Sequence, residues 1–507
     1  MNMKNFIFGV FLISLGMFSC TDLNEDLNST IPGDVATQII NESADVSSLL
    51  VATEDALDLP IQDQTRFWAA SQHTTDETIG PTRGPDWDDN GIWRVLHDHT
   101  WSPDHQFLSD TWNDLLLVVF NATNTLSFNP NAEIEAQARF LRAYAMFSVA
   151  DGWNQVPFRE PGGNLLDPPT VLSGADALSF LISETQSAIA GLPDGPAATP
   201  NKDAARVLLM KAFLNSGTFA DRENPSFPAA DMQQVISLSD EIINSGRYSL
   251  SDNIFDNFAR NNDQISTENI WTLGNEGGVK GGNAQSRYFC GLHYNQNPSG
   301  WNGFTTLGDF YNLFEEGDIR RGTDYAGVTE VSGLNVGFLI GQQFDGDGNA
   351  IQDRLGNPLI FTPDVALLES GGNLEVTGIR VVKYPPDYQT SFPIENDYVV
   401  YRFADVLLMR AEAMMRMGNT SGALDIVNQI REVRGASALS ALSEQELLDE
   451  RGRELYWEGH RRQDLIRFGR FLDAYAEKPA SGTERLLFPI PANSLATNPN
   501  LSQNPGY

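Results

Sequence analysis

The sequence predicts a mostly α-helical fold in which helix pairs form a scaffold and loops with short strands form a variable region. Three observations support this prediction. Apolar residues recur at helical spacing from 401 to 435. The same spacing returns between 111 and 250, with capping residues at helix starts. Residues 250 to 400 instead hold clustered glycine and asparagine and only short apolar runs.

Two helices and a tight turn are expected between Tyr401 and Gly435. The first helix has an apolar face formed by Ala404, Leu407, Leu408, Ala411, Met414 and Met415. Gly418 and Asn419 end that helix, because glycine readily takes the left-handed conformation. The second helix has an apolar face formed by Ala423, Ile426, Val427, Ile430 and Val433. A pair of about 34 residues with this pattern is similar to a tetratricopeptide repeat, and since one pair cannot bury its own apolar face, further pairs are expected.

Capping patterns mark further helices before and after this pair. Asn129-Pro130 offers a cap with proline at the first helical position, and Ser443 with Glu446 forms a capping box. The expected helical scaffold covers about 40–60, 111–250 and 401–475. The expected variable insertions are 61–110 and 275–400, and short strands are expected at 268–273 and 379–384.

The N-terminal residues are typical of an exported lipoprotein. Lys4 precedes an apolar run from 6 to 18 that is too short to span a bilayer but fits a signal peptide. Ser19-Cys20 follows it, which indicates a signal peptide over 1–19 and lipidation of Cys20; the alternative is a signal peptide cut elsewhere with Cys20 incidental. If Cys20 carries lipid, the second cysteine, Cys290, has no disulfide partner.

Charge limits the classes of partner. The chain has 507 residues and a formal charge of −34, which argues against nucleic acid and anionic membrane surfaces as partners. Strongly anionic ligands are also disfavoured, and no cofactor is expected.

Charged residues alternate along the segment from 450 to 462. Glu450, Glu454 and Glu458 lie four residues apart among arginines. A row of carboxylates could do acid–base chemistry, but the dense arginines favour a structural ion-pair network.

Three other patterns could carry chemistry, and each is weak. Histidines and aspartates cluster between 97 and 105, where polar packing is favoured over a metal site. The stretch 345–357 has calcium-loop features but lacks the required glycine and glutamate, so hairpin turns are favoured. Cys290 and His293 lie three residues apart in a glycine-rich loop, and this spacing alone is weak evidence for a nucleophile and its base. No metal site is therefore expected.

Four segments together resemble one family, the RagB/SusD family of outer-membrane glycan-binding lipoproteins. They are FLRAYAMFSVADGWNQVPF at 140–158, YRFADVLLMRAEAMMRMGN at 401–419, ERGRELYWEGHRRQDLIRFG at 450–469 and LLFPIPANSLATNPNLSQNPGY at 486–507. The resemblance implies a single SusD-like domain over 20–507, with tetratricopeptide-like helix pairs and a variable ligand-binding region. It also implies a SusC-type TonB-dependent transporter as partner, with the lipoprotein as its lid.

Sugar binding requires flat aromatic faces for C–H groups and planar polar groups for hydroxyls. Two stretches, 81–101 and 283–304, combine both among turn residues, and in the resembling family loops from these regions supply the binding surface. The candidate glycan-binding residues are Arg83, Asp86, Trp87, Trp93, Tyr288 and Trp301. The alternative for the tryptophans is burial in the core.

The sequence and the resemblance together predict a cell-surface lipoprotein of the outer membrane. It would capture oligosaccharides, with a neutral glycan such as a β-glucan favoured by the acidic charge, and deliver them to the transporter. Catalysis is not expected. Two alternatives remain, which are a glycoside hydrolase on a helical scaffold and a peptide-capturing member of the same family.

Overall fold

The computed structural model describes residues 44–390 and 392–507, and these are mostly helical. The predicted signal peptide and Cys20 lie outside the described residues, and a domain over 20–507 stays a prediction. The long helices are α2 (Val46–Gln62), α5 (Gln106–Leu126), α6 (Ala132–Trp153), α7 (Gly174–Ala188), α8 (Lys202–Leu214), α10 (Ala229–Asn244), α15 (Phe403–Arg416), α16 (Thr420–Val433) and α17 (Glu444–Leu455).

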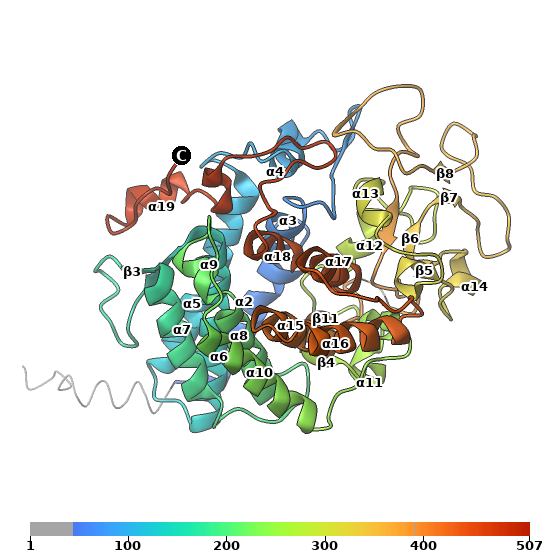
Figure 1. Cartoon of the computed structure of the whole chain (residues 1–507). Helices are drawn as coiled ribbons and strands as arrows, with labels where there is room; N and C mark the ends of the chain where they lie inside the picture. The colour runs from blue at the N-terminus through green and yellow to red at the C-terminus, as the bar shows by residue number, and fades with distance from the viewer. Residues whose placement is uncertain (1–43, 391) are drawn as a thin grey trace, which may run out of the picture. The chain divides into compact units, whose positions relative to one another are not determined.

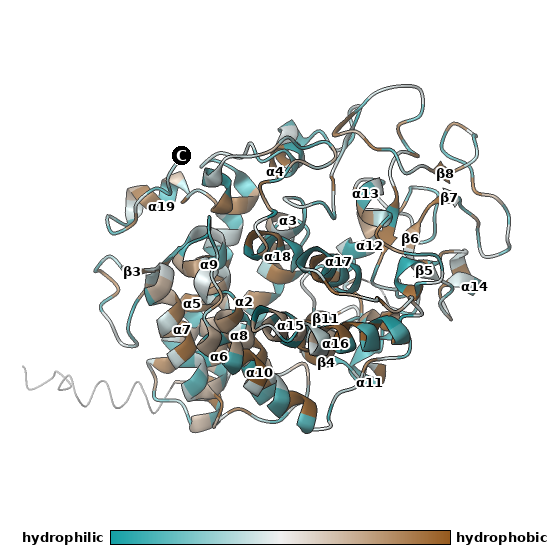
Figure 2. Ribbon diagram, in the orientation of Figure 1, coloured by the Kyte–Doolittle hydropathy of each residue, from teal (hydrophilic) through white to brown (hydrophobic). Residues whose placement is uncertain are grey.

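The long helices pack against one another in a row that forms the scaffold. Helix α5 packs between α2 and α6, α6 packs on α7, α8 packs on α10, and α10 packs on α15, which pairs with α16. Figure 1 shows α5 to α8 side by side and the α15–α16 pair next to α10. Helices α10 and α16 each carry a hydrophilic face and a hydrophobic one (Figure 2). The predicted helix-pair scaffold is confirmed.

Side-chain caps explain where several of these helices begin. The Asn131 carboxamide oxygen accepts from the backbone N–H of Glu133 at 3.1 Å and of Ile134 at 3.0 Å, so α6 starts after Asn131 rather than after Asn129. The Ser443 hydroxyl accepts from the N–H of Glu446 at 3.1 Å, as the capping box predicts.

One predicted helix is wrong in its extent, and the residues leading into the 401–435 pair form a strand that was not predicted. Residues Tyr398–Arg402 form strand β11, and helix α15 begins only at Phe403. The capping box at Ser443 predicts one helix that continues through 449–469, but α17 ends at Leu455 and α18 (Arg461–Arg467) follows a break. Trp457 within the break has a left-handed φ of 61°, which no continuous α-helix allows.

Short helices and turns occupy the insertions and the C-terminal segment. They are α3 (Phe67–Gln72), η1 (Asp89–Gly91), α4 (Ile92–His97), α9 (Ser216–Ala220), η2 (Ile254–Phe258), α11 (Asn262–Ile265), α12 (Ser286–Phe289), α13 (Gly308–Tyr311), η3 (Ile319–Arg321), α14 (Thr329–Ser332), η4 (Thr483–Leu486) and α19 (Ala492–Thr497). No helix among the described residues is long and apolar enough to span a membrane.

The strands are short and form small sheets. Strand β4 (Asn269–Leu273) pairs antiparallel with β11, and β10 (Arg380–Val382) pairs with β6 (Val336–Leu339), which also pairs with β5 (Gly322–Thr323). Two-stranded sheets join β1 (Thr82–Arg83) to β9 (Leu368–Glu369), β2 (Gln155–Phe158) to β3 (Thr170–Ser173), and β7 (Gly341–Gln342) to β8 (Ile360–Phe361). Both strands expected from sequence, near 268–273 and 379–384, are present.

The α15–α16 pair offers a test of the scaffold. Leu408 on α15 is fully buried, as are Val427 and Ile430 on α16. We expect Leu408→Ala to lower the free energy of unfolding by about 3 kcal/mol, because it leaves a cavity in a packed core. Chemical denaturation measures the loss. Met417→Ala, at the exposed end of α15, is the control and should change little; equal effects for both variants would contradict this packing.

Candidate ligand-binding surface

Trp87 and Trp301 come from distant parts of the chain and meet at the surface. The indole N–H of Trp87 donates to the backbone oxygen of Trp301 at 2.9 Å, and the ring centroids lie 6.4 Å apart. The Trp301 residue is 47% exposed, whereas Trp87 is half-buried. Gly303 permits this arrangement, since any Cβ there would overlap the Trp87 ring.

Two phenylalanines extend the tryptophan pair. The Phe289 ring lies edge-on to Trp301 at a centroid distance of 5.0 Å and edge-on to Phe392 at 5.4 Å. Phe392 is 53% exposed. We call Trp87, Phe289, Trp301 and Phe392 the aromatic surface. The sequence did not indicate Phe392 as a candidate, because it lies outside the two stretches, 81–101 and 283–304, that combine aromatic and polar residues.

Asp86, which directly precedes Trp87, belongs to a cluster of polar side chains. We call Asp86, Tyr294, Arg354 and Glu375 the polar rim. The Tyr294 hydroxyl donates to Asp86 at 3.1 Å, and the Arg354 guanidinium lies 3.9 Å from the centre of the Tyr294 ring. Arg354 also donates to Glu375 at 2.6 Å and lies 3.6 Å from Asp86. The rim thus joins the loop after β7 to the loops carrying the two tryptophans.

His293 supports the rim from below. Its ring is buried, its Nδ1 accepts from the N–H of Asn295 at 3.1 Å, and its Nε2 therefore carries the proton and donates to Glu375 at 2.8 Å. Burial lowers the pKa of His293 despite the nearby carboxylate, so the ring is neutral at pH 7. Burial raises the pKa of Glu375, but the bonds from His293 and Arg354 outweigh it and hold the pKa below its ordinary value.

The structure places three of the six candidate residues inside the protein. Arg83 is 3% exposed and donates to the backbone oxygens of Leu374 at 2.7 Å and Thr377 at 2.8 Å. Burial lowers the pKa of Arg83 to about 10. Trp93 is buried and donates to Asp89 at 2.9 Å, and Tyr288 is also buried. These three side chains are too buried to contact a ligand. The other three candidates, Asp86, Trp87 and Trp301, lie close together at the surface.

The histidines between 97 and 105 are packing residues. His97 bonds to the backbone oxygens of Thr78 at 3.3 Å and Ala476 at 3.1 Å, and His99 bonds to that of Thr74 at 2.9 Å. Polar packing was favoured from sequence and is what the structure has. Within residues 44–390 and 392–507, no group of three or more His, Cys, Asp or Glu side chains could hold a metal ion.

The 345–357 stretch forms two successive hairpin turns, as predicted. Asp345 accepts from the N–H groups of Asp347 at 3.0 Å and Asn349 at 2.8 Å, and Asp353 does the same for Leu355 and Asn357, both at 2.8 Å.

Cys290 does not have the environment of a nucleophile. It is buried, and burial raises the pKa of its thiol, so the thiolate that would attack a substrate is disfavoured.

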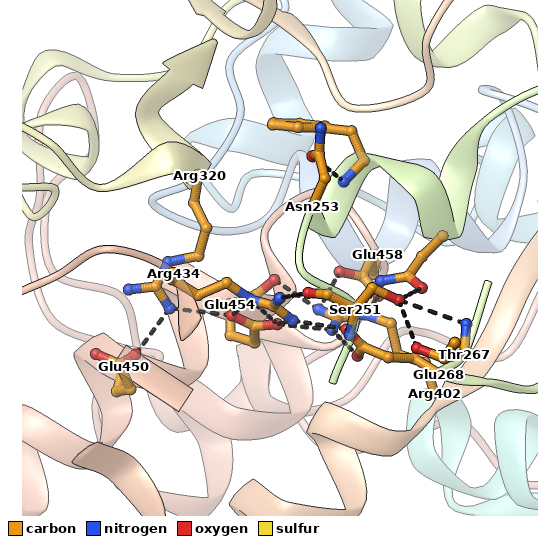
Figure 3. A network of polar contacts seen from close by, with 12 residues as sticks. Ser251, Asn253, Thr267, Glu268, Arg320, Arg402, Arg434, Glu450, Glu454 and Glu458 are labelled. Carbon is orange, nitrogen blue, oxygen red and sulfur yellow. Dashed lines mark hydrogen bonds and ion pairs between the residues drawn. The ribbon is translucent and has the colours of Figure 1, made fainter. Parts of the chain in front are cut away.

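A buried ion-pair network holds the variable region on the scaffold (Figure 3). Glu454 lies 3.0 Å from Arg320, 2.7 Å from Arg402 and 2.8 Å from Arg434, and all four side chains are buried. Arg320 belongs to η3, Arg402 ends β11, Arg434 follows α16 and Glu454 belongs to α17. The structural interpretation of the 450–458 carboxylates is therefore confirmed, and the network joins four separate segments.

Comparisons with known proteins agree with this fold. The model of the SusD family matches residues 267–482. The starch-binding protein SusD of Bacteroides thetaiotaomicron is 26% identical, over 73% of this chain and 72% of the relative. A SusD-like protein, P25, of Formosa agariphila is 25% identical, over 79% of this chain and 80% of the relative.

Solved structures share the fold over nearly the whole chain. A SusD-like protein from Bacteroides fragilis superposes with a TM-score of 0.71 at 18% identity, covering 94% of this chain and 100% of that one. A laminarin-binding SusD-like protein superposes with a TM-score of 0.66 at 21% identity, covering 91% and 99%. The surface glycan-binding protein A of Bacteroides thetaiotaomicron, in complex with laminarihexaose, has a TM-score of 0.63 at 16% identity, covering 90% and 98%. The chain thus contains a region that matches the SusD family model, and its curated relatives and the similar solved structures include SusD-like proteins.

Proposed function

We propose that this chain is a glycan-binding lipoprotein of the outer-membrane surface that captures oligosaccharides on its aromatic surface. The observation that carries the proposal is the pair of exposed rings, Trp301 and Phe392, which both pack against Phe289, together with the nearby polar rim. The rings would cover the C–H faces of a sugar, and the rim would bond its hydroxyls.

The expected affinity is modest. Burying on the order of 100 Å² of apolar area on one indole face contributes about 2.5 kcal/mol. Two such aromatic platforms plus a few hydrogen bonds, less the cost of ordering the flexible glycan, then give a dissociation constant of roughly micromolar to millimolar. A carrier that must release its cargo requires such weak binding.

The charges of the rim favour a neutral glycan. Asp86 and Glu375 are carboxylates, and the guanidinium of Arg354, the cation of the rim, is already paired with Glu375 at 2.6 Å. An anionic sugar would meet unbalanced negative charge here, on a chain whose formal charge is −34. Two similar structures are described with laminarin or laminarihexaose, which makes a neutral β-glucan the first glycan to test.

Calorimetric titration tests this function. The lipid-free chain from residue 21 onward is titrated with β-glucan oligosaccharides, with sulfated or uronate oligosaccharides, and with unrelated peptides. Saturable binding of the neutral glycan alone supports the proposal, and binding of peptides alone would assign peptide capture instead. Reducing ends are measured in the same samples, and their release would identify a hydrolase.

Hydrolysis is not expected at the aromatic surface. A glycosidase requires a pair of carboxyl groups, one of which has a raised pKa and donates a proton. Glu375 on the rim has a lowered pKa instead, held there by His293 and Arg354. We therefore propose binding without cleavage.

The proposed partner is a SusC-type TonB-dependent transporter. We expect the lipidated chain to copurify with a large β-barrel protein after extraction in a mild detergent. Gel filtration and mass spectrometry of the extracted complex measure this. Recovery of the chain alone in several mild detergents would contradict the partnership.

The proposed anchor is lipid on Cys20. We expect Cys20→Ala to move the protein out of the membrane fraction, because the acyl chains that hold it there are lost. Cell fractionation with immunodetection measures the shift, and Cys290→Ala serves as the control and should stay with the membrane. Continued membrane association of Cys20→Ala would contradict lipid anchoring through this residue.

A further inference from the structure

A ligand-sized hollow lies along helix α5, and none of its lining residues belongs to the aromatic surface. It has a volume of about 370 Å³, and its walls are α5, β2 and the loop from β2 to β3. Its apolar lining comes mainly from Leu116, Val119, Phe120, Phe158, Leu165 and Pro169. Phe120 is 46% exposed and Leu165 is 66% exposed, so both leave apolar area open to a ligand. We call this hollow the α5 groove.

The α5 groove is long and changes polarity along its length. The lining residues of α5 and its C-cap run from Leu116 to Ser127, which is about 16 Å at 1.5 Å per residue. Leu116 and Phe120 are apolar, whereas Asn124 and Ser127 at the other end are polar. The Ser127 hydroxyl also accepts from the N–H of Gly162 at 2.8 Å, so the β2–β3 loop closes over the polar end. A groove with one apolar end and one polar end fits a ligand that has an apolar tail and a polar head group.

Arg159 supplies a cation to the lining. Its guanidinium donates to the backbone oxygen of Asn164 at 2.6 Å, and no ion pair of Arg159 is found among residues 44–390 and 392–507. Glu160, the one acidic lining residue, is exposed and likewise forms no ion pair within those ranges. On a strongly acidic chain, a guanidinium without a carboxylate partner beside an apolar groove favours an anionic head group.

We propose that the α5 groove binds a single-chain anionic amphiphile, with its alkyl tail along Leu116 and Phe120 and its carboxylate at Arg159. A tail of about twelve carbons has an extended length close to the ~16 Å of the lining helix. The volume also lies within the range of small-molecule sites, which are mostly apolar with a few polar groups. This site is independent of glycan capture.

Titration with fatty acids of different length tests the proposal. The lipid-free chain from residue 21 onward is used, since residues 45–507 form one compact unit. The probes are octanoate, dodecanoate and hexadecanoate, each below its critical micelle concentration. We expect dodecanoate to bind more than tenfold tighter than octanoate, because each buried methylene adds affinity, and hexadecanoate to gain little more.

Three variants locate the ligand in the groove. Phe120→Asp should abolish dodecanoate binding, and since Phe120 is half-exposed the variant should fold. Arg159→Gln should weaken binding about tenfold, and Arg159→Lys, which keeps the charge but loses the planar guanidinium, should weaken it less. All three should bind glycan like the wild type, whereas Trp301→Ala should bind dodecanoate normally.

Several results would overturn the proposal. If dodecanoate does not bind saturably, or if it still binds to Phe120→Asp, then the α5 groove does not hold its alkyl chain. Equal binding of dodecanol and dodecanoate removes the anionic head. If dodecanoate does not bind and the chain sediments with phosphatidylglycerol vesicles, the groove faces membrane lipid instead. If Phe120→Asp abolishes only copurification with the β-barrel protein, the groove is a protein interface.

Discussion

Replacing Glu454 with alanine is expected to lower the free energy of unfolding by roughly 3–5 kcal/mol, the range for breaking a buried ion pair. The carboxylate lies between the guanidiniums of Arg320, Arg402 and Arg434, at 3.0, 2.7 and 2.8 Å. Without this carboxylate, the three buried guanidiniums repel one another and lose a counter-charge. The free-energy cost of removing them from water is then no longer offset. Urea denaturation followed by circular dichroism measures the loss.

Glu444→Ala on the same helix is the matched control. Its side chain also pairs with an arginine, Arg416, at 2.7 Å, but it is 64% exposed. Exposed pairs contribute about 0–1 kcal/mol, so this variant should be nearly as stable as the wild type. If Glu454→Ala does not fold, Glu454→Gln keeps the shape of the side chain and should fold with reduced stability. Equal stability of all these variants would show that the network does not stabilise the fold.

The effect of Glu454 should also depend on pH. Burial raises the pKa of Glu454, but Arg434, Arg402 and Arg320 outweigh it and hold the pKa well below its ordinary value. A carboxylate with a depressed folded-state pKa stabilises the fold fully above its unfolded pKa of about 4.3 and progressively less as pH falls below that. The stability gap between wild type and Glu454→Ala should therefore be full at pH 7 and narrow below about pH 4.

The helical scaffold could be predicted because its signals are local. Apolar spacing within 401–435 and the capping box at Ser443 need no knowledge of distant residues. The arginines close in sequence to the 450–458 carboxylates indicate a structural role for them. The pairing of Glu454 with Arg320 could not be predicted, because Arg320 lies in a distant segment without a helical pattern. Strand β11 was missed because its burial depends on pairing with β4, more than a hundred residues earlier.

The candidate site was predictable in part, and for a physical reason. Turn residues around Trp87 and Trp301 indicate that the chain runs at the surface there, and both lie together. The same reasoning places Arg83 at the surface, where the structure instead buries it under backbone oxygens of Leu374 and Thr377. Whether a side chain in a turn points outward depends on what packs over it, and the residues that cover Arg83 lie almost 300 positions later in the sequence.

Trp301→Ala is expected to weaken glycan binding tenfold or more and to leave the melting temperature unchanged. The exposed indole provides apolar area to the ligand but little to the core, since the Trp301 residue is 47% exposed. Trp87→Ala should weaken binding similarly but also lower the melting temperature, because its ring packs 4.9 Å from Phe304 and fills the space above Gly303. Calorimetric titration and thermal denaturation of each variant measure the two effects.

Phe120→Ala provides the control for exposed aromatic area away from the site. Its ring is 46% exposed, almost the same as Trp301, but it lies in the α5 groove. If glycan binds nonspecifically to exposed apolar area, Trp301→Ala and Phe120→Ala should both weaken binding. If glycan stacks on the aromatic surface, only Trp301→Ala should weaken it. The double change of Trp87 and Trp301 should reduce affinity about a hundredfold if each ring stacks on a separate sugar. Wild-type affinity in Trp301→Ala would place the glycan elsewhere on the protein.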